Sequence, residues 1–143
     1  MKKLLIIFIS LLFTGVVYSQ DDQSMDIFIE ALIHVESKGD TFAIGDNGRA
    51  IGVLQIHPIM VREVNRILEK KGIQRSYTYN DRYDYDKSIQ MFLIWYDYYH
   101  KYASYEKIAR CWNGGPTGYT KHCTKNYWYK VSYYMNQLAW VEW

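Results

Sequence analysis

The sequence has little net charge, and its small excess lies at one end. It contains 17 Lys and Arg residues against 15 Asp and Glu, a formal net charge of +2. Lys2 and Lys3 account for that excess, so residues 20–143 hold 15 basic and 15 acidic side chains. A surface that binds nucleic acid needs a basic excess to pair with phosphates. We therefore expect no DNA or RNA partner.

Cysteine and histidine are also scarce, which limits metal chemistry. The chain has two cysteines and four histidines, and their spacing lacks the close pairs of ligands that mark a zinc site. We expect no metal site, and no motif for an organic cofactor is present.

A long hydrophobic run is missing as well. The most apolar stretch, Leu4 to Val17, is shorter than the roughly 20 residues of a membrane-spanning helix. It follows Lys2 and Lys3 and precedes small residues around Ser19, the pattern of a cleaved secretory signal. We predict a signal peptide over residues 1–19 and secretion across the inner membrane, to the periplasm or outside the cell. An uncleaved anchor is the alternative.

Export would expose the two cysteines, Cys111 and Cys123, to an oxidising compartment. A disulfide between them would close a short loop and stabilise the fold by about 3 kcal/mol in the chain-entropy description. We predict this disulfide, with two free thiols as the alternative.

Residues 20–143 suit one domain with one core. Apolar spacing, caps and breakers predict a mainly α domain with one irregular hairpin or loop. The expected elements are helices over 24–38, 58–71, 85–102, 104–115 and 124–140, with the hairpin or loop over 41–56.

The first predicted helix places a carboxylic acid on its apolar face. Residues at helical spacing on that face are Met25, Phe28, Ile29, Leu32 and Glu36. Burial against apolar side chains disfavours the ionised form and raises the pKa of a carboxyl group. Glu36 is therefore a candidate general acid, since such a group must still be protonated near neutral pH.

Three further elements follow Glu36 along the chain. Gln55 ends an apolar stretch, Asn113 follows Trp112 in a glycine-rich turn, and Tyr127 lies early in the last predicted helix. With the Glu36-Ser37 pair, these elements resemble the soluble lytic transglycosylase family of the lysozyme-like superfamily. The matching segments are Glu36-Ser37, Gly52-Val53-Leu54-Gln55, Trp112-Asn113-Gly114-Gly115 and Tyr127, with Tyr129 as the runner-up for the last.

The resemblance implies a lysozyme-like domain over residues 20–143 that cleaves the β-1,4 bond between N-acetylmuramic acid and N-acetylglucosamine in peptidoglycan. Glu36 would serve as acid and then as base, while the muramic acid C6 hydroxyl attacks and a 1,6-anhydro end forms. Contacts to glycan or acid are implied for Ser37, Gln55, Asn113 and Tyr127, and a contact to glycan is implied for Trp112. Leu54 and Trp112 replace the family's usual methionine and tyrosine, which bears on substrate preference.

Other functions stay open at this point. A hydrolytic lysozyme of the same fold would want a second carboxylate, for which Asp40 and Asp46 are the nearby candidates, although both also suit turn positions. A catalytically silent wall-binding or assembly module and a chitin-cleaving enzyme are further alternatives. We expect a monomer, with peptidoglycan strands as its partner and a secretion, conjugation or phage-assembly apparatus as a candidate protein partner.

Overall fold

The computed structural model of the protein describes residues 20–141; the predicted signal peptide, residues 1–19, lies outside them. Within the described residues the chain forms five α-helices and one small antiparallel hairpin, so the mainly α prediction is confirmed. The elements are α1 (Gln20–Ser37), β1 (Ile44–Gly45), β2 (Ala50–Ile51), α2 (Pro58–Lys70), α3 (Tyr85–Tyr99), α4 (Tyr105–Gly114) and α5 (Lys125–Val141).

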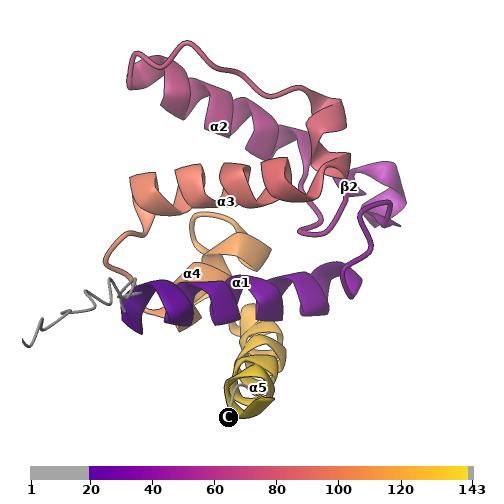
Figure 1. Ribbon diagram of the computed structural model, residues 1–143, viewed down its shortest axis with the longest axis vertical. Coiled ribbons are helices and arrows are strands. Elements are labelled where there is room, and N and C mark those ends of the chain that lie inside the picture. The colour runs from indigo at the N-terminus through magenta and orange to yellow at the C-terminus, as the bar shows by residue number, and fades with distance from the viewer. Residues whose placement is uncertain (1–19, 142–143) are drawn as a thin grey trace, which may run out of the picture.

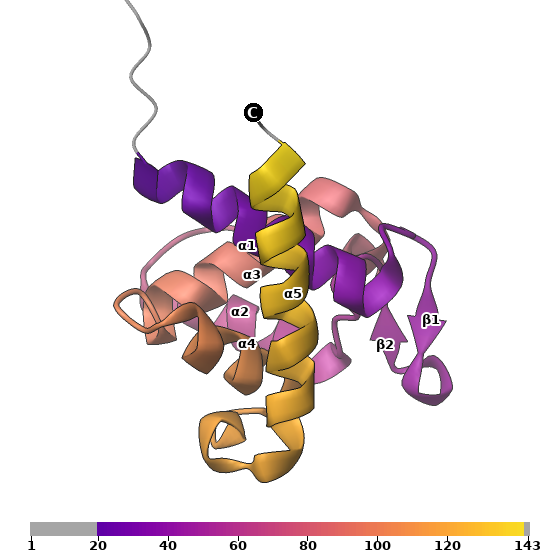
Figure 2. The ribbon, with the colours of Figure 1, turned by 90° about the horizontal axis from the view of Figure 1, so that it is seen from below.

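The helices stack in layers. Helix α2 lies on α3, and α1 and α4 lie beneath α3 (Figure 1). Helix α5 runs across α1 and α4 and is seen nearly end-on in Figure 1 and along its length in Figure 2. The last helix thus covers the first.

Local sequence explains where three helices begin. Pro58 occupies the first turn of α2, where its missing N–H costs no hydrogen bond. The Asp84 carboxylate accepts the Lys87 N–H at the start of α3, at 2.9 Å. The Ser104 hydroxyl does the same for the Lys107 N–H at the start of α4, as predicted.

One hydrophobic core joins all five helices and the segment after the hairpin. Phe28 and Leu32 come from the apolar face of α1 that the sequence predicted, and Leu54 and Ile56 follow the hairpin. The other large, fully buried side chains are Val53, Val61, Val64, Ile67, Met91, Phe92, Ile108 and Val131.

The end of α3 differs from the sequence prediction. This helix ends at Tyr99, three residues earlier than expected, because the backbone leaves the helical region at His100. The core face of α3 carries Met91, Phe92 and Trp95, which are buried, whereas Leu93 is 37% exposed.

The hairpin is closed by β1 and β2, with Ile44 opposite Ile51. Gly52 follows with a φ of 77°, and a Cβ there would lie 1.9 Å from the Arg82 carbonyl oxygen. Only glycine fits such a position. The Arg82 guanidinium in turn donates to the carbonyls of Arg49 and Ile56, which ties the segment before α3 to the hairpin.

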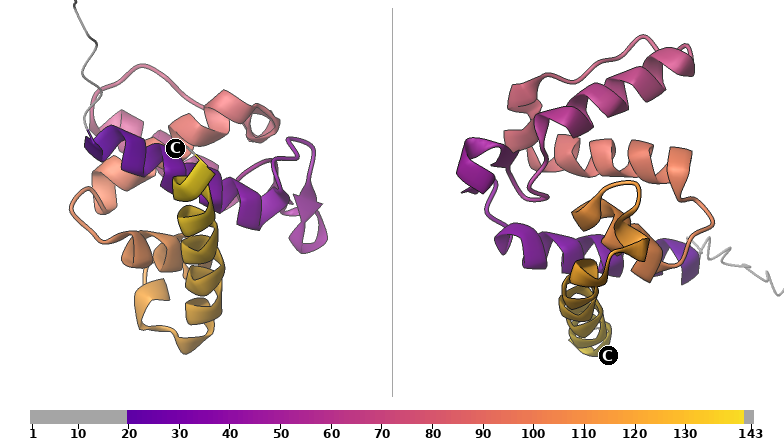
Figure 3. Two further views of the ribbon diagram at one scale, coloured as in Figure 1. Left: turned by 60° about the horizontal axis from the view of Figure 1, so that its bottom comes forward. Right: turned by 180° about the vertical axis from the view of Figure 1, so that it is seen from behind.

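A second arginine fixes the turn between α4 and α5. Arg110 is buried, and its guanidinium donates to the Thr124 hydroxyl, the Glu106 carboxylate and the Lys121 carbonyl. The Thr124 hydroxyl lies 2.7 Å from the Gly118 carbonyl oxygen. The hydroxyl of Thr124, where the last helix was predicted to begin, joins this network, which folds residues 115–124 back onto α4 (Figure 3).

No helix among the described residues combines the length and the apolar character that crossing a membrane would take.

Thr124→Val should destabilise the protein by about 2 kcal/mol, because it leaves the buried Nε of Arg110 without a partner and removes one of the two hydrogen bonds to the Gly118 carbonyl. Thr120→Val is a matched control, since the Thr120 hydroxyl is exposed and donates only to Thr117; it should change stability by less than about 0.5 kcal/mol. Urea denaturation of the two variants would measure the difference. Equal values would contradict the role given to Thr124.

Candidate active site

The site centres on Glu36, the second-to-last residue of α1. Its Oε1 accepts a hydrogen bond of 2.6 Å from the hydroxyl of Tyr127, 91 residues later in the chain. Tyr127 is the third residue of α5, so the bond joins the first turn of α5 to the last turn of α1. The structure thus joins the first and last of the four predicted elements.

Trp112 also contacts the acid. Its side chain hydrogen-bonds Glu36, and the indole N–H is the only donor it has. The ring is held edge-on against Phe92 and Trp95, with ring centres 5.2 Å apart in each pair. From the sequence, we expected Trp112 to contact the glycan and did not expect it to hydrogen-bond Glu36.

The environment of Glu36 sets its pKa by opposing effects. Burial raises the pKa from 4.5 to about 7, and the hydrogen bonds from Tyr127 and Trp112 lower it in part. Burial beside Glu36 raises the pKa of Tyr127 well above its usual value, so Tyr127 remains a hydrogen-bond donor. Glu36 is therefore close to half-protonated at neutral pH and can both give and take a proton.

Ser37 links the acid's helix to the segment after the hairpin. Its hydroxyl donates to the Val53 carbonyl at 2.9 Å and accepts the Gly39 N–H at 3.2 Å. We had expected Ser37 to contact glycan or acid. In the structure it fixes the end of α1, and with it Glu36, against the residues that lead to Gln55.

Gln55 holds the hairpin together. Its side-chain amide donates to the carbonyls of Ala43 and Gly52, at 3.2 and 3.0 Å, from a backbone with a φ of 49°. A Cβ on Gly45 would come within 2.2 Å of the Gln55 amide oxygen, so a glycine there leaves room for this side chain. Gln55 thus braces the hairpin, two residues after the Val53 carbonyl that accepts the Ser37 hydroxyl.

Asn113 and Tyr129 lie on the outer side. Asn113 is exposed on the last turn of α4, one residue from Trp112. Tyr129, the runner-up for the helical tyrosine, is 67% exposed and lies in the groove between α1 and α5 described below. Tyr127, and not Tyr129, is the partner of Glu36.

The predicted disulfide is absent: the structure holds Cys111 and Cys123 as free thiols. Cys111 lies on the buried face of α4, with its sulfur 3.8 Å from the Pro116 carbonyl oxygen, whereas Cys123 is exposed. Hydrogen bonds of Arg110 and Thr124 close the turn that we expected a disulfide to close.

Asp40 and Asp46, the two candidates for a second catalytic carboxylate, make contacts within turns. From the sequence, both residues were also expected to suit turn positions. Asp40 accepts the Phe42 N–H at 2.8 Å. Asp46 pairs with Arg49 at 2.9 Å and lies 3.5 Å from the Nε2 of His57. Within the described residues, no carboxylate is among the groups that shift the pKa of Glu36.

Metal-ligating side chains do not gather in the described part of the chain: no group of three or more His, Cys, Asp or Glu residues could hold an ion there. Comparisons of the chain with protein-family models, with curated proteins and with solved structures found no match.

Glu36→Gln should stabilise the protein more at pH 8 than at pH 4. Because folding raises the pKa of Glu36, this carboxyl favours the folded state most below pH 4.5, and its contribution is lost as the pH rises through about 7. Glutamine has no charge to bury at any pH. The gain in unfolding free energy from Glu36→Gln should therefore grow by roughly 3 kcal/mol between pH 4 and pH 8, as measured by urea denaturation at each pH. A constant gain would mean that Glu36 titrates normally.

Tyr127→Phe should raise the pKa of Glu36 above 7, because it removes a hydrogen bond that favours the carboxylate. Carbon-13 NMR of the labelled glutamate carboxyl would measure it. Tyr129→Phe, on the same helix, is the control and should leave the pKa unchanged. A lowered pKa in Tyr127→Phe would contradict the role given to the hydroxyl.

Proposed function

We propose that the protein is an exported peptidoglycan lytic transglycosylase with a lysozyme-like fold, in which Glu36 is the catalytic acid and base. The observation that carries the proposal is the setting of this carboxyl group: burial raises its pKa to about 7 while Tyr127 and Trp112 hydrogen-bond to it. A glycosidic oxygen needs a proton donor of this kind, because the leaving group departs as an alcohol.

The order of the four elements adds support. The resemblance to soluble lytic transglycosylases pairs an acid on the first helix with a tyrosine on the last, and these two residues hydrogen-bond in the structure. Ser37, the next matched position, hydrogen-bonds the Val53 carbonyl in the matched segment that ends at Gln55. These contacts among matched positions support the proposal.

In the first step, the Glu36 carboxyl gives its proton to the glycosidic oxygen, and the bond between that oxygen and the muramic acid C1 breaks. The sugar passes through an oxocarbenium-like state, and Glu36 becomes a carboxylate. The hydrogen bonds from Tyr127 and Trp112 favour this charge as it develops, because both donors are already in place.

In the second step, the C6 hydroxyl of the same sugar attacks C1 and returns its proton to Glu36. The product carries a 1,6-anhydro bond, and the acid is restored for another cycle. A pKa near 7 suits one group that first gives and then takes a proton. No second carboxylate is needed, which agrees with the turn contacts of Asp40 and Asp46.

The products distinguish this function from its rivals. Purified mature protein, residues 20–143, should release muropeptides with anhydromuramic ends from isolated peptidoglycan, and Glu36→Gln should reduce their release by at least about 1,000-fold. Mass spectrometry of the soluble fraction measures both proteins. Asp46→Asn is the matched control, and it should retain activity because Asp46 is paired on the surface.

Other outcomes would point elsewhere. Reducing muramic ends, lost in Asp46→Asn or Asp40→Asn, would indicate a hydrolytic lysozyme. Reducing ends released from chitin would indicate a chitin-cleaving enzyme. No products from the native protein, with binding to peptidoglycan intact, would favour the catalytically silent module.

A further inference from the structure

A groove lies between α1 and α5, and neither Glu36 nor Tyr127 is among the residues that line it. We call it the α1–α5 groove. Its volume is about 490 Å³, within the range of sites that hold small ligands. The lining residues used below are His34, Lys38, Tyr129, Lys130, Tyr133 and Tyr134.

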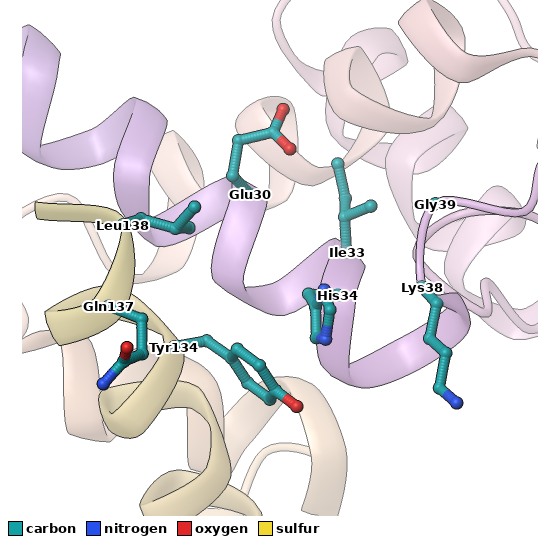
Figure 4. A pocket seen from close by; sticks show the side chains of 8 residues that line it. All are labelled: Glu30, Ile33, His34, Lys38, Gly39, Tyr134, Gln137 and Leu138. Atoms are coloured by element: carbon teal, nitrogen blue, oxygen red, sulfur yellow. The ribbon is translucent and has the colours of Figure 1, made fainter. Parts of the chain in front are cut away.

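A smaller hollow of about 230 Å³ extends it along the same two helices. Figure 4 shows this part, where the side chains of His34 and Tyr134 come close together from opposite helices. Their ring centres are 3.9 Å apart, and His34, Lys38 and Tyr134 line both hollows. The two hollows therefore adjoin each other along α1 and α5.

Aromatic rings face solvent along the groove. Tyr133 is 58% exposed and Tyr129 is 67% exposed. Tyr133 packs edge-on against Tyr134, at 5.3 Å between ring centres, which limits the freedom of both rings. A tyrosine offers a flat apolar face and a hydroxyl, and sugar rings offer apolar C–H faces edged with hydroxyls. The two surfaces are complementary.

The charged groups of the larger hollow are all basic. Lys38 and Lys130 are exposed, and neither makes an ion pair with any described residue. The one acidic lining residue, Glu30, lies in the smaller hollow and accepts a hydrogen bond from the Tyr85 hydroxyl at 2.7 Å. The groove therefore has free positive charge although residues 20–143 are neutral as a whole, and it favours a ligand with carboxylates.

We propose that the α1–α5 groove is a second glycan-binding site, which holds a carboxylate-bearing sugar strand against Tyr129 and Tyr133 and pairs its carboxylates with Lys38 and Lys130. The proposal rests on the proposed function, which supplies such a strand, since peptidoglycan bears carboxylates on its lactyl groups and peptides. Lys38 is two residues from Glu36, and Tyr129 is two residues from Tyr127. The groove would keep the protein on peptidoglycan while Glu36 acts.

The test measures binding without turnover, in the full chain carrying Glu36→Gln. Adding Tyr133→Ala and Lys130→Gln in the groove should weaken cosedimentation with insoluble peptidoglycan about tenfold in Kd. The matched control adds Tyr102→Ala and Lys107→Gln, an exposed tyrosine and lysine of the α3–α4 region. It should change Kd by less than about twofold. Circular dichroism spectra of both variants should match that of the parent.

Several results would overturn the proposal: a groove variant that binds like its parent, a parent that does not bind peptidoglycan, or uncharged chitin bound as tightly as peptidoglycan. The proposal would also be overturned if the parent self-associates in light scattering and the groove variant does not, while both bind glycan equally. That result would assign the groove to a second copy of the chain.

The outcome is separable from that of the proposed function. With Glu36 restored, the groove variant should still release anhydro ends from a short soluble muramyl oligosaccharide at the native rate. If the native protein releases none, while the groove variant still loses binding, the proposed function fails and the groove remains a glycan site.

Discussion

The hydrogen bond between Glu36 and Tyr127 is the contact on which the rest of the site depends. It requires that α5 cross the end of α1, and the turn before α5 is held by Arg110 and Thr124. It also requires that Glu36 stay in place, which Ser37 ensures by binding the segment after the hairpin. Each of these contacts serves packing, and together they fix one carboxyl group between two donors.

The balance at that carboxyl group is chemical as well as geometric. Burial alone would push the pKa of Glu36 far up, and two donors alone would push it down. The fold combines both, with Trp112 held by the aromatic cluster of α3 and Tyr127 by α5. A single acid that must give and regain a proton in one cycle needs this intermediate affinity for protons.

The helices and the candidate acid Glu36 could be predicted from the sequence, because the sequence features that indicate them act over short distances along the chain. The apolar spacing that ends at Glu36, the proline at position 58 and the serine at position 104 each act within a few residues. Contacts between helices that are distant in the sequence have no local sequence feature of this kind. The Trp112 hydrogen bond and the Arg110 network depend on where α4 and α5 come to rest, and the free state of Cys111 follows from that same packing.

The separation of 91 positions between Glu36 and Tyr127 has a consequence for biosynthesis. Until the last helix has emerged and docked, Glu36 lacks its hydrogen bond from Tyr127. A chain that is still being made, or that is cut before α5, therefore has an incomplete site. The surroundings that set the pKa of Glu36 are assembled only when the whole domain has folded.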